Sequence, residues 1–355
     1  MGEALELARR LAEEHTLSDE ELLALIQYRD GETADFLREQ AVQTARRTFG
    51  RQIYLRGLVE FTNHCRRDCR YCGIRRSNGN ARRYRLTPEE VLDACRAGHR
   101  LGFRTFVLQG GEDPWWDDGR LCALVSALKK EFPDSAVTLS VGERSRESYA
   151  RLRAAGADRY LLRHETADPD HYAFLHPPGQ TLRDRLRCLA DLKELGYQVG
   201  AGMMVGSPGQ TAACLAADLA FLRDFRPHMV GIGPYLSHPD TPFAGAPDGS
   251  AELTLYLLSV VRLLLPQALL PATTALGTAL ADGREQGILH GANVVMPNLT
   301  PPEQREKYLL YHDKLSAGAE SAAGLKELRA RLAAIGYEPV VQRGDSPLIL
   351  TGKQR

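Results

Sequence analysis

Three cysteines lie close together in the segment EFTNHCRRDCRYCGIR, residues 60–75, with the spacing C-x3-C-x2-C. Thiolates are ligands for zinc and for iron–sulfur clusters. Cys65, Cys69 and Cys72 together would bind three irons of a 4Fe–4S cubane and leave the fourth iron open to a small molecule with an amine and a carboxylate. The alternatives are a zinc site with a remote fourth ligand such as His64, or three cysteines without any ligand. The charged residues that interleave the cysteines disfavour the last of these.

The other four cysteines show a different pattern. Each lies among apolar residues at helical spacing, which is typical of small buried side chains on helices; they are Cys95, Cys122, Cys188 and Cys214. The total of seven is odd, and only the group at 65–72 is clustered. The pattern therefore predicts a cytoplasmic protein with one metal-type site, not a disulfide-bonded scaffold.

Charge and hydropathy exclude several classes of protein. The chain has 45 basic and 45 acidic residues, so no overall field attracts nucleic acid or an anionic membrane. No apolar run reaches the roughly 18 residues that a membrane span requires. Arginine is nevertheless dense beside the cysteines, between Arg66 and Arg85, where Asp68 is the one acidic residue. This face is either an ordinary solvated one or a docking surface for an acidic reductant such as ferredoxin or flavodoxin.

The elements that position these residues follow from periodicity. Helices are predicted within residues 1–50; one begins after Ser18 as N-cap, and another covers 31–49 and ends at Gly50. From residue 51, short β-branched or aromatic runs alternate with amphipathic stretches. The predicted strands are 53–61, 104–109, 136–141, 158–163, 197–204, 228–232, 268–272 and 293–296. The predicted helices are 88–101, 117–132, 145–155, 180–195, 210–223, 251–265 and 283–290, with 320–335 after the last strand.

Eight strand–helix pairs in series predict an α/β protein with a closed (βα)8 TIM-type barrel. The barrel would cover residues 51–355, including a C-terminal helical segment. Residues 1–50 would form an N-terminal helical extension packed on the barrel. A doubly wound open sheet with two misassigned strands is the alternative. In a barrel of this type the site lies at the C-terminal ends of the strands. Residues with unusual chemistry concentrate there: the cysteine loop, Gly110-Gly111-Glu112, Ser140, Arg163, Glu165, Thr273-Thr274 and Met296.

The cysteine loop resembles that of the radical S-adenosylmethionine (SAM) superfamily. The aromatic Tyr71 precedes the last cysteine, and the motif directly follows the first predicted strand. The resemblance implies one 4Fe–4S cluster whose open iron binds the amine and carboxylate of SAM. It also implies reductive cleavage of SAM to methionine and a 5′-deoxyadenosyl radical. The run Gly110-Gly111-Glu112 resembles the GGE motif of the superfamily, which implies contact with the methionine ammonium.

Further stretches are similar to the HydE family of FeFe-hydrogenase maturases: LQGGEDP, RYLLRHETADP, GAGMMVGSPGQT, MVGIGPYLSHPDTP, PATTALGT and GANVVMPN. Biotin synthase and methylornithine synthase share the barrel and the cysteine loop. The resemblance implies that Glu165 contacts SAM, that Arg185 pairs with the SAM carboxylate and that Met229 lines the adenosyl side. It also implies a substrate pocket formed by Arg163, Ser140, Thr273, Thr274, Met296 and Tyr311. Some members carry a second set of cysteines near the C-terminus, but residues 300–355 contain none, so we expect no second cluster.

The function implied by this resemblance is assembly of the di-iron subcluster of the FeFe-hydrogenase active site, the H-cluster. The substrate would be a cysteine-bearing iron–carbonyl–cyanide complex supplied by another maturase. Arg163 and the pair Thr273-Thr274 would suit the carboxylate of such a substrate. Two alternatives stay open. One is a methylornithine-synthase-like or biotin-synthase-like enzyme acting on a small amino-acid-type substrate. The other is a non-catalytic iron–sulfur electron carrier, which would have four protein ligands and no SAM site.

Overall fold

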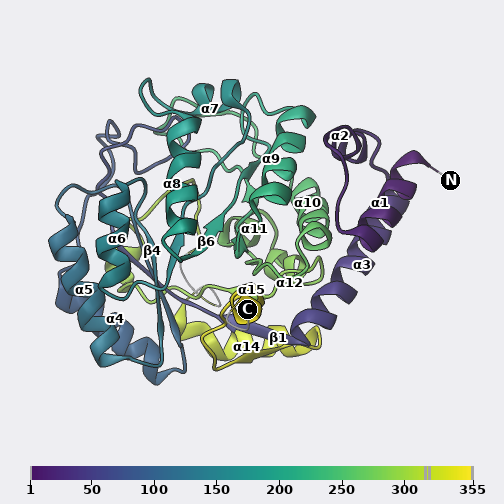
Figure 1. Ribbon diagram of the computed structural model, residues 1–355. Coiled ribbons are helices and arrows are strands. Elements are labelled where there is room, and N and C mark those ends of the chain that lie inside the picture. The colour runs from purple at the N-terminus through teal and green to yellow at the C-terminus, as the bar shows by residue number, and fades with distance from the viewer. Residues whose placement is uncertain (1, 316–317, 319–320, 353–355) are drawn as a thin grey trace.

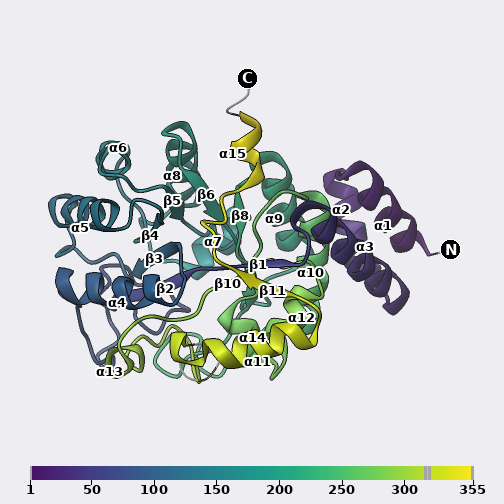
Figure 2. The same cartoon turned by 90° about the horizontal axis from the view of Figure 1, so that it is seen from below.

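In the computed structural model the chain forms a barrel of parallel strands surrounded by helices (Figure 1). The structure describes residues 2–315, 318 and 321–352. Three helices precede the barrel: α1 (Glu3–Glu14), α2 (Asp19–Gln27) and α3 (Gly31–Phe49). They lie at one side of the barrel, where α2 packs on α9 (Ala212–Phe225) and α3 packs on α10 (Ala251–Leu264), as both views show (Figures 1 and 2). That these helices form a domain of their own remains a prediction.

Every strand pair that the structure describes is parallel. One sheet contains, in spatial order, β2 (Gly57–Thr62), β3 (Thr105–Gly110), β4 (Ala136–Ser140), β5 (Arg159–Leu161), β6 (Gln198–Ala201) and β8 (Met229–Val230). Parallel bridges close the remaining gap, from Met229 to Leu269 and from Pro271 to Val294 of β10 (Val294–Val295). β10 then pairs with β1 (Gln52–Leu55), which leads into β2. The predicted closed barrel is therefore confirmed, and the open doubly wound sheet is wrong.

Helices cover the outside of the barrel (Figure 1). Their first turns are fixed by capping residues. Thr87 caps α4 (Pro88–Arg100): its hydroxyl accepts from the N–H of Glu90, and the Glu90 carboxylate accepts from the N–H of Thr87. Pro88 at the first helical position adds a backbone angle that already suits the helix. The predicted ranges also cover α5 (Asp118–Glu131), α6 (Arg146–Ala154), α8 (Leu182–Glu194), α12 (Gly283–Ile288) and α14 (Leu325–Ala334).

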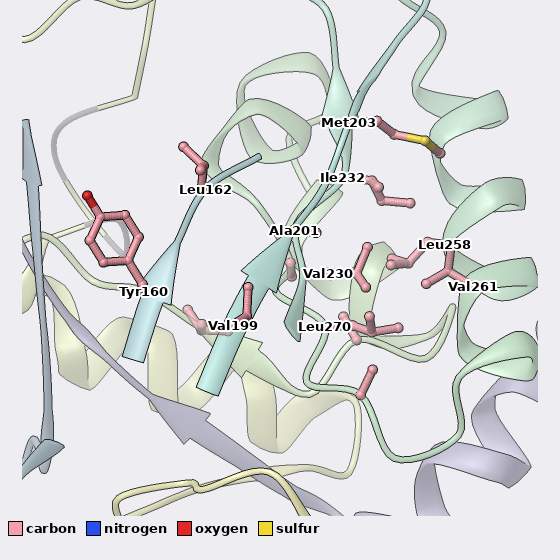
Figure 3. Close-up of a cluster of buried hydrophobic side chains, with 14 of the residues drawn as sticks. Tyr160, Leu162, Val199, Ala201, Met203, Val230, Ile232, Leu258, Val261 and Leu270 are labelled. Atoms are coloured by element: carbon pink, nitrogen blue, oxygen red, sulfur yellow. The ribbon is translucent and has the colours of Figure 1, made fainter. Parts of the chain in front are cut away.

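The hydrophobic core lies between the strands and these helices. The side chains of Val230, Ile232 and Leu270 point outward from the barrel and pack against Leu258 and Val261 of α10 (Figure 3). All five residues are at most 2% exposed. Full burial of such a side chain contributes roughly 1.5–3 kcal/mol to folding. Because successive side chains of a strand point to opposite faces, the residues between these outward ones face the lumen. The outer face is therefore apolar, and the inner face is available for chemistry.

The structure differs from the predicted elements in several places. The strand predicted over 53–61 is divided at Arg56 into β1 and β2, and the strand predicted over 268–272 is reduced to isolated bridges. Pro271 has no N–H to give to a ladder, which explains the second difference. A strand that the sequence does not predict, β11 (Glu338–Val340), pairs with β1. The unpredicted helices, which are too short to show a clear period, are α7 (Pro169–Leu175), α11 (Thr274–Ala279), α13 (Pro302–Arg305) and α15 (Pro347–Gly352). β7 (Met204–Val205) and β9 (Gly233–Pro234) form a further short pair.

The segment after β11 closes the N-terminal end of the barrel. Arg159 begins β5, is 2% exposed, and donates to Oδ1 of Asp345 at 2.7 Å and to Oγ1 of Thr105 at 3.0 Å. The amide of Gln198 donates to the same carboxylate oxygen at 2.6 Å. Arg159 and Gln198 begin the neighbouring strands β5 and β6, so Asp345 ties these two strands together at the bottom, and Arg159 extends the contact to Thr105 at the start of β3. No helix among the described residues is long and apolar enough to cross a membrane.

His228 predicts a pH dependence of stability. Its Nδ1 accepts from the N–H of Val199 at 3.0 Å, and burial lowers the pKa of His228 from 6.5 to about 4. The folded pKa is depressed, so the stability that the neutral ring contributes is present above pH 6.5 and is lost as the pH falls toward 4. His228→Asn keeps an acceptor and does not titrate. In urea unfolding at several pH values, we expect the free energy of unfolding of the wild type to fall more steeply in this window than that of the variant. Parallel curves would contradict the assignment.

Candidate active site

The three cysteines lie on the loop that follows β2, between residues 63 and 85. The polar groups of the loop fix its shape. The side-chain amide of Asn63 donates to the carbonyl oxygens of Arg82 and Lys307 at 2.9 and 2.8 Å. The guanidinium of Arg83 donates to four carbonyls within the loop at 2.6–3.2 Å, those of Asn63, Ile74, Arg75 and Asn78. Buried backbone groups are thereby paired, and the cysteines are presented on an ordered loop at the barrel mouth.

The three thiols are free and partly buried. Burial raises the pKa of Cys69 to about 12, and burial also raises the pKa of Cys65 and of Cys72. Thiols in such surroundings lose their protons when a metal centre takes the place of the proton. Gly111 brings the next loop against them, because a Cβ at this position would lie 2.3 Å from the His64 carbonyl oxygen. No three His, Cys, Asp or Glu side chains within the described ranges form a site for a single metal ion. Three thiols on one loop fit a cluster, whose irons take their ligands at separate corners.

Glu112 joins the cysteine loop to the end of β3. Its Oε2 accepts from the guanidinium groups of Arg66 and Arg67 at 2.9 and 2.6 Å, and its Oε1 accepts from the N–H of Glu143 at 2.9 Å. The carboxylate is therefore committed to protein groups and holds the loop in place. Contact of this segment with the SAM ammonium, which the resemblance implies, stays a prediction.

Glu143, which follows β4, extends this network toward the end of β5. Its Oε2 accepts from Arg67 at 2.8 Å and its Oε1 accepts from Nε of Arg185 at 2.7 Å. Arg185 lies on α8 but is only 6% exposed, and Nη1 of Arg185 donates to the carbonyl oxygen of Arg163. Arg185 is thus a buried part of the site and not a surface charge. Sequence reasoning did not single out Glu143; its place just after β4, in Val141-Gly142-Glu143, is the signal that could have found it.

Helix α7 covers one side of the cysteine loop. The carbonyl of Leu175 accepts from the N–H of Arg70 at 2.9 Å, and the hydroxyl of Tyr71 lies 3.2 Å from Nε2 of His176. Nδ1 of the same ring lies 2.9 Å from the carbonyl oxygen of Tyr172. Since a carbonyl only accepts, Nδ1 carries the hydrogen, and Tyr71 donates to Nε2. Burial lowers the pKa of His176 to about 3, so the ring stays neutral.

Arg163 and Glu165 follow β5 at the barrel mouth. Glu165 has a φ of 68°, in the left-handed region that non-glycine residues avoid unless their surroundings hold them there. Nη2 of Arg163 lies 3.0 Å from Oε2 of Glu165, but the geometry is not that of a hydrogen bond. Nε and Nη2 of Arg163 and Oε2 of Glu165 are buried without a hydrogen-bond partner among the described residues. Such atoms fit a site that receives a polar ligand.

A second set of unpaired polar atoms lies deeper in the barrel. Arg56, between β1 and β2, is 1% exposed, and its Nη1 lies 2.7 Å from Sδ of Met229 on β8. These strands are not neighbours, so the contact crosses the lumen. Nε and Nη2 of Arg56 and Oγ1 of Thr138 on β4 have no hydrogen-bond partner in the described part of the chain. The sequence analysis missed Arg56, whose signal is a lone charge within the apolar run IYLRGLV.

Comparison with known proteins agrees with this geometry. The family model of the radical SAM superfamily matches residues 59–222. The [FeFe] hydrogenase maturase subunit HydE of Thermotoga maritima is 45% identical over 299 residues, which are 84% of this chain and 85% of that protein. The chain belongs to the HydE family of the radical SAM superfamily.

Other similarities fall within the same superfamily. A biotin synthase of Desulforudis audaxviator is 31% identical over 79% of this chain and 84% of that protein. The crystal structure of methylornithine synthase (PylB) superimposes with a TM-score of 0.82 at 28% identity, over 94% of this chain and 97% of that one. Radical SAM enzymes use a 4Fe–4S cluster and SAM, so these are the cofactors of this HydE-family enzyme. The zinc protein and the non-catalytic electron carrier are thereby excluded.

The remaining predicted pocket residues of this HydE-family enzyme come from several strand ends. Ser140 is the last residue of β4. Thr273 caps α11: its hydroxyl accepts from the N–H of Leu276 at 3.4 Å and lies 3.4 Å from the carbonyl oxygen of Ile232. Thr274 is the first residue of the same helix. Thr273 therefore has a structural role at the barrel mouth in addition to the predicted one.

Met296 and Tyr311 lie on the C-terminal side of the barrel. Met296 packs against the buried cluster that contains Met229, Leu269 and Val294. Tyr311 follows Leu310, whose carbonyl accepts from the N–H of Gly73 in the cysteine loop at 2.8 Å. The structure thus brings the segment of Tyr311 to the cysteine loop. The roles of both residues toward SAM or substrate stay predictions.

The network around Glu143 predicts a loss of stability. Glu143→Gln removes the charge that pairs with both Arg67 and Arg185, and breaking a buried ion pair costs roughly 3–5 kcal/mol. A matched control is Glu131→Gln on α5, whose ion pair with Arg96 is exposed and should cost less than about 1 kcal/mol. Urea unfolding of the cluster-free protein measures both. Equal losses in the two variants would show that the network is not a buried constraint.

Proposed function

We propose that this enzyme matures FeFe-hydrogenase by acting on a cysteine-bearing iron–carbonyl–cyanide complex that contributes to the di-iron subcluster of the H-cluster. The observation that carries the proposal is the polar lumen in a chain 45% identical to a HydE. An anionic complex with polar diatomic ligands needs a buried cation and hydrogen-bond donors, and Arg56 and Thr138 offer unpaired atoms there. The Asp345 contacts join strands at the opposite end of the barrel, so we place the substrate at the end that carries the cysteine loop.

The cofactor site would lie above this chamber. We assign the cluster to Cys65, Cys69 and Cys72, and the SAM site to Tyr71, Gly110, Gly111, Glu112, Glu165, Arg185 and Met229. When bound, the cluster and SAM supply an electron and a 5′-deoxyadenosyl radical. The unpaired Oε2 of Glu165 can accept a hydrogen bond from the cofactor. Arg185, which Glu143 orients, supplies a positive charge for the SAM carboxylate.

The substrate would be anchored at the rim. Nε and Nη2 form one edge of a guanidinium, and this edge binds a carboxylate through two parallel hydrogen bonds. Both of these atoms in Arg163 are buried without a hydrogen-bond partner among the described residues, and the charge of the nearby Glu165 carboxylate holds the guanidinium in place. The hydroxyls of Thr273 and Thr274 and that of Ser140 come from other strand ends around the same mouth. A cysteine carboxylate at Arg163 would leave the rest of the substrate directed into the lumen, toward Arg56, with Met296 and Tyr311 enclosing it.

Electrons would reach the cluster through the basic face. The side chain of Arg66 is 55% exposed and that of Arg76 is 69% exposed, and both lie on the cysteine loop. Complementary charge speeds encounter with a partner and orients it. We assign this face to an acidic electron donor such as ferredoxin or flavodoxin. Another hydrogenase maturase would supply the iron complex.

Hydrogenase activation tests the proposed function. Expression of this chain in a strain that lacks its own HydE, but retains the hydrogenase and the other maturases, should restore hydrogenase activity. Cys69→Ser should abolish the effect and lower the iron content, because a cluster ligand is lost. The matched control is Cys122→Ala, which changes a cysteine on α5 outside the loop and should retain both activity and iron.

The structural likeness to methylornithine synthase gives a second candidate. If the purified, reconstituted enzyme formed 3-methylornithine and the chain did not restore hydrogenase activity, that activity would replace the proposed one. Equal loss of iron in Cys69→Ser and Cys122→Ala would refute the ligand assignment.

Arg163→Lys separates the substrate step from the cofactor step. Lysine keeps the charge but loses the two parallel donors, so turnover of substrate should fall roughly tenfold or more. Cleavage of SAM without substrate should persist, because Arg163 is assigned to the substrate. Measurement of 5′-deoxyadenosine with and without substrate distinguishes the two steps. If both activities fell equally, the carboxylate anchor would have to be placed elsewhere.

A further inference from the structure

Gln180 lies beside one of the three cysteines, on the segment between α7 and α8. Its Oε1 lies 3.8 Å from Sγ of Cys69 and accepts a hydrogen bond from the Cys69 thiol. The side chain is 5% exposed, and its Nε2 has no hydrogen-bond partner among the described residues. A buried amide therefore turns its acceptor toward the sulfur and leaves its donor unused.

A second unused group lies next to this amide. The hydroxyl of Tyr172 on α7 is buried, at 1% exposure of the residue, and also has no hydrogen-bond partner in the described ranges. Burial raises the pKa of Tyr172, and a side-chain interaction with Gln180 is among the effects that oppose burial. The hydroxyl and the amide therefore interact, but neither the Tyr172 hydroxyl nor Nε2 of Gln180 makes a hydrogen bond of good geometry among the described residues.

The other side chain near this sulfur is already engaged. The Tyr71 O–H donates to Nε2 of His176, because Nδ1 of that ring carries its hydrogen toward the Tyr172 carbonyl. The one hydrogen of the Tyr71 hydroxyl is therefore shared between His176 and the Cys69 sulfur. Gln180 is a neighbouring side chain whose N–H donors have no partner among the described residues.

The chemistry of the thiol changes when it binds the cluster. A cysteine ligand is a thiolate, which accepts hydrogen bonds and has no hydrogen to donate. Its contact with Oε1 would then become repulsive. A half-turn of the amide exchanges two groups of nearly equal size. It directs Nε2 toward the sulfur and Oε1 toward the Tyr172 hydroxyl, so that both unused groups are satisfied.

On the proposed assignment of Cys69 as a cluster ligand, we propose that Gln180 donates a hydrogen bond to the Cys69 thiolate and that Tyr172 holds the amide in this orientation. Hydrogen bonds to the sulfurs of an iron–sulfur cluster favour its reduced, more negative state and so help to set its reduction potential. Gln180 would thus make the cluster easier to reduce, and Tyr172 would be a positioning residue that acts through it.

The test is the midpoint potential of the reconstituted cluster, followed by electron paramagnetic resonance. Gln180→Met keeps the length of the side chain and removes the donor, so the midpoint should become more negative. A tenfold weaker affinity of the cluster for its electron would appear as a shift of about 59 mV. Tyr172→Phe should shift the midpoint in the same direction by less. The double variant should equal Gln180→Met, because the hydroxyl acts only through the amide.

An unchanged midpoint in Gln180→Met with a full iron content would overturn the proposal. If that variant failed to bind the cluster, Tyr172→Phe would decide the matter, and an unchanged midpoint there would overturn it as well. If the midpoint shifts of the two single variants added up in the double variant, Tyr172 would not act through Gln180. The measurement requires neither substrate nor hydrogenase, so its failure can be told apart from a failure of the proposed function.

Discussion

The ion-pair chain of Glu112, Arg67, Glu143 and Arg185 is the constraint on which the geometry of the mouth depends. The carboxylates of Glu112 and Glu143 are 8% and 9% exposed, and each joins groups that come from different strand ends. Desolvation offsets much of the Coulomb attraction of buried ion pairs, so such pairs add little net stability, whereas their loss is costly. The network therefore acts by fixing positions. It holds the cysteine loop against the loops after β3, β4 and β5, where a cofactor that contacts all of them would bind.

Arg56, Arg159 and Arg163 differ in how their guanidinium groups are paired. At the bottom, Arg159 is paired with Asp345 and hydrogen-bonded to Thr105, as expected of a structural charge. Arg56 and Arg163 each keep two buried nitrogen atoms without hydrogen-bond partners among the described residues, whereas Arg159 keeps one, and Nη2 of Arg163 also lies 3.0 Å from the Glu165 carboxylate. A buried cation without such partners is costly unless a ligand supplies them. The same residue type thus joins strands at Arg159 and leaves donors for an anionic ligand at Arg56.

Sequence periodicity predicted the barrel because its strands and long helices each repeat a simple apolar pattern that survives without tertiary information. It predicted the cysteine loop and the strand-end residues because parallel βα units bring the ends of all strands to one rim. It missed α7, α11 and β11, because short elements carry too few residues for a period. For the same reason it missed Tyr172 and Gln180, whose importance depends on what α7 covers.

The sequence by itself determined the fold class, the cluster-type spacing of Cys65, Cys69 and Cys72, and the family, because these depend on local pattern and order along the chain. Only the tertiary structure decided which charges are paired. The resemblance implied a role for Arg185 toward SAM, but only the structure showed that this helix residue is buried and paired with Glu143. Arg56 was not singled out from the sequence, and only its contact with Met229 showed that its side chain lies inside the barrel. The energy of a charged side chain depends on its burial and on partners from distant segments. Neither can be inferred from the residues next to it in the sequence.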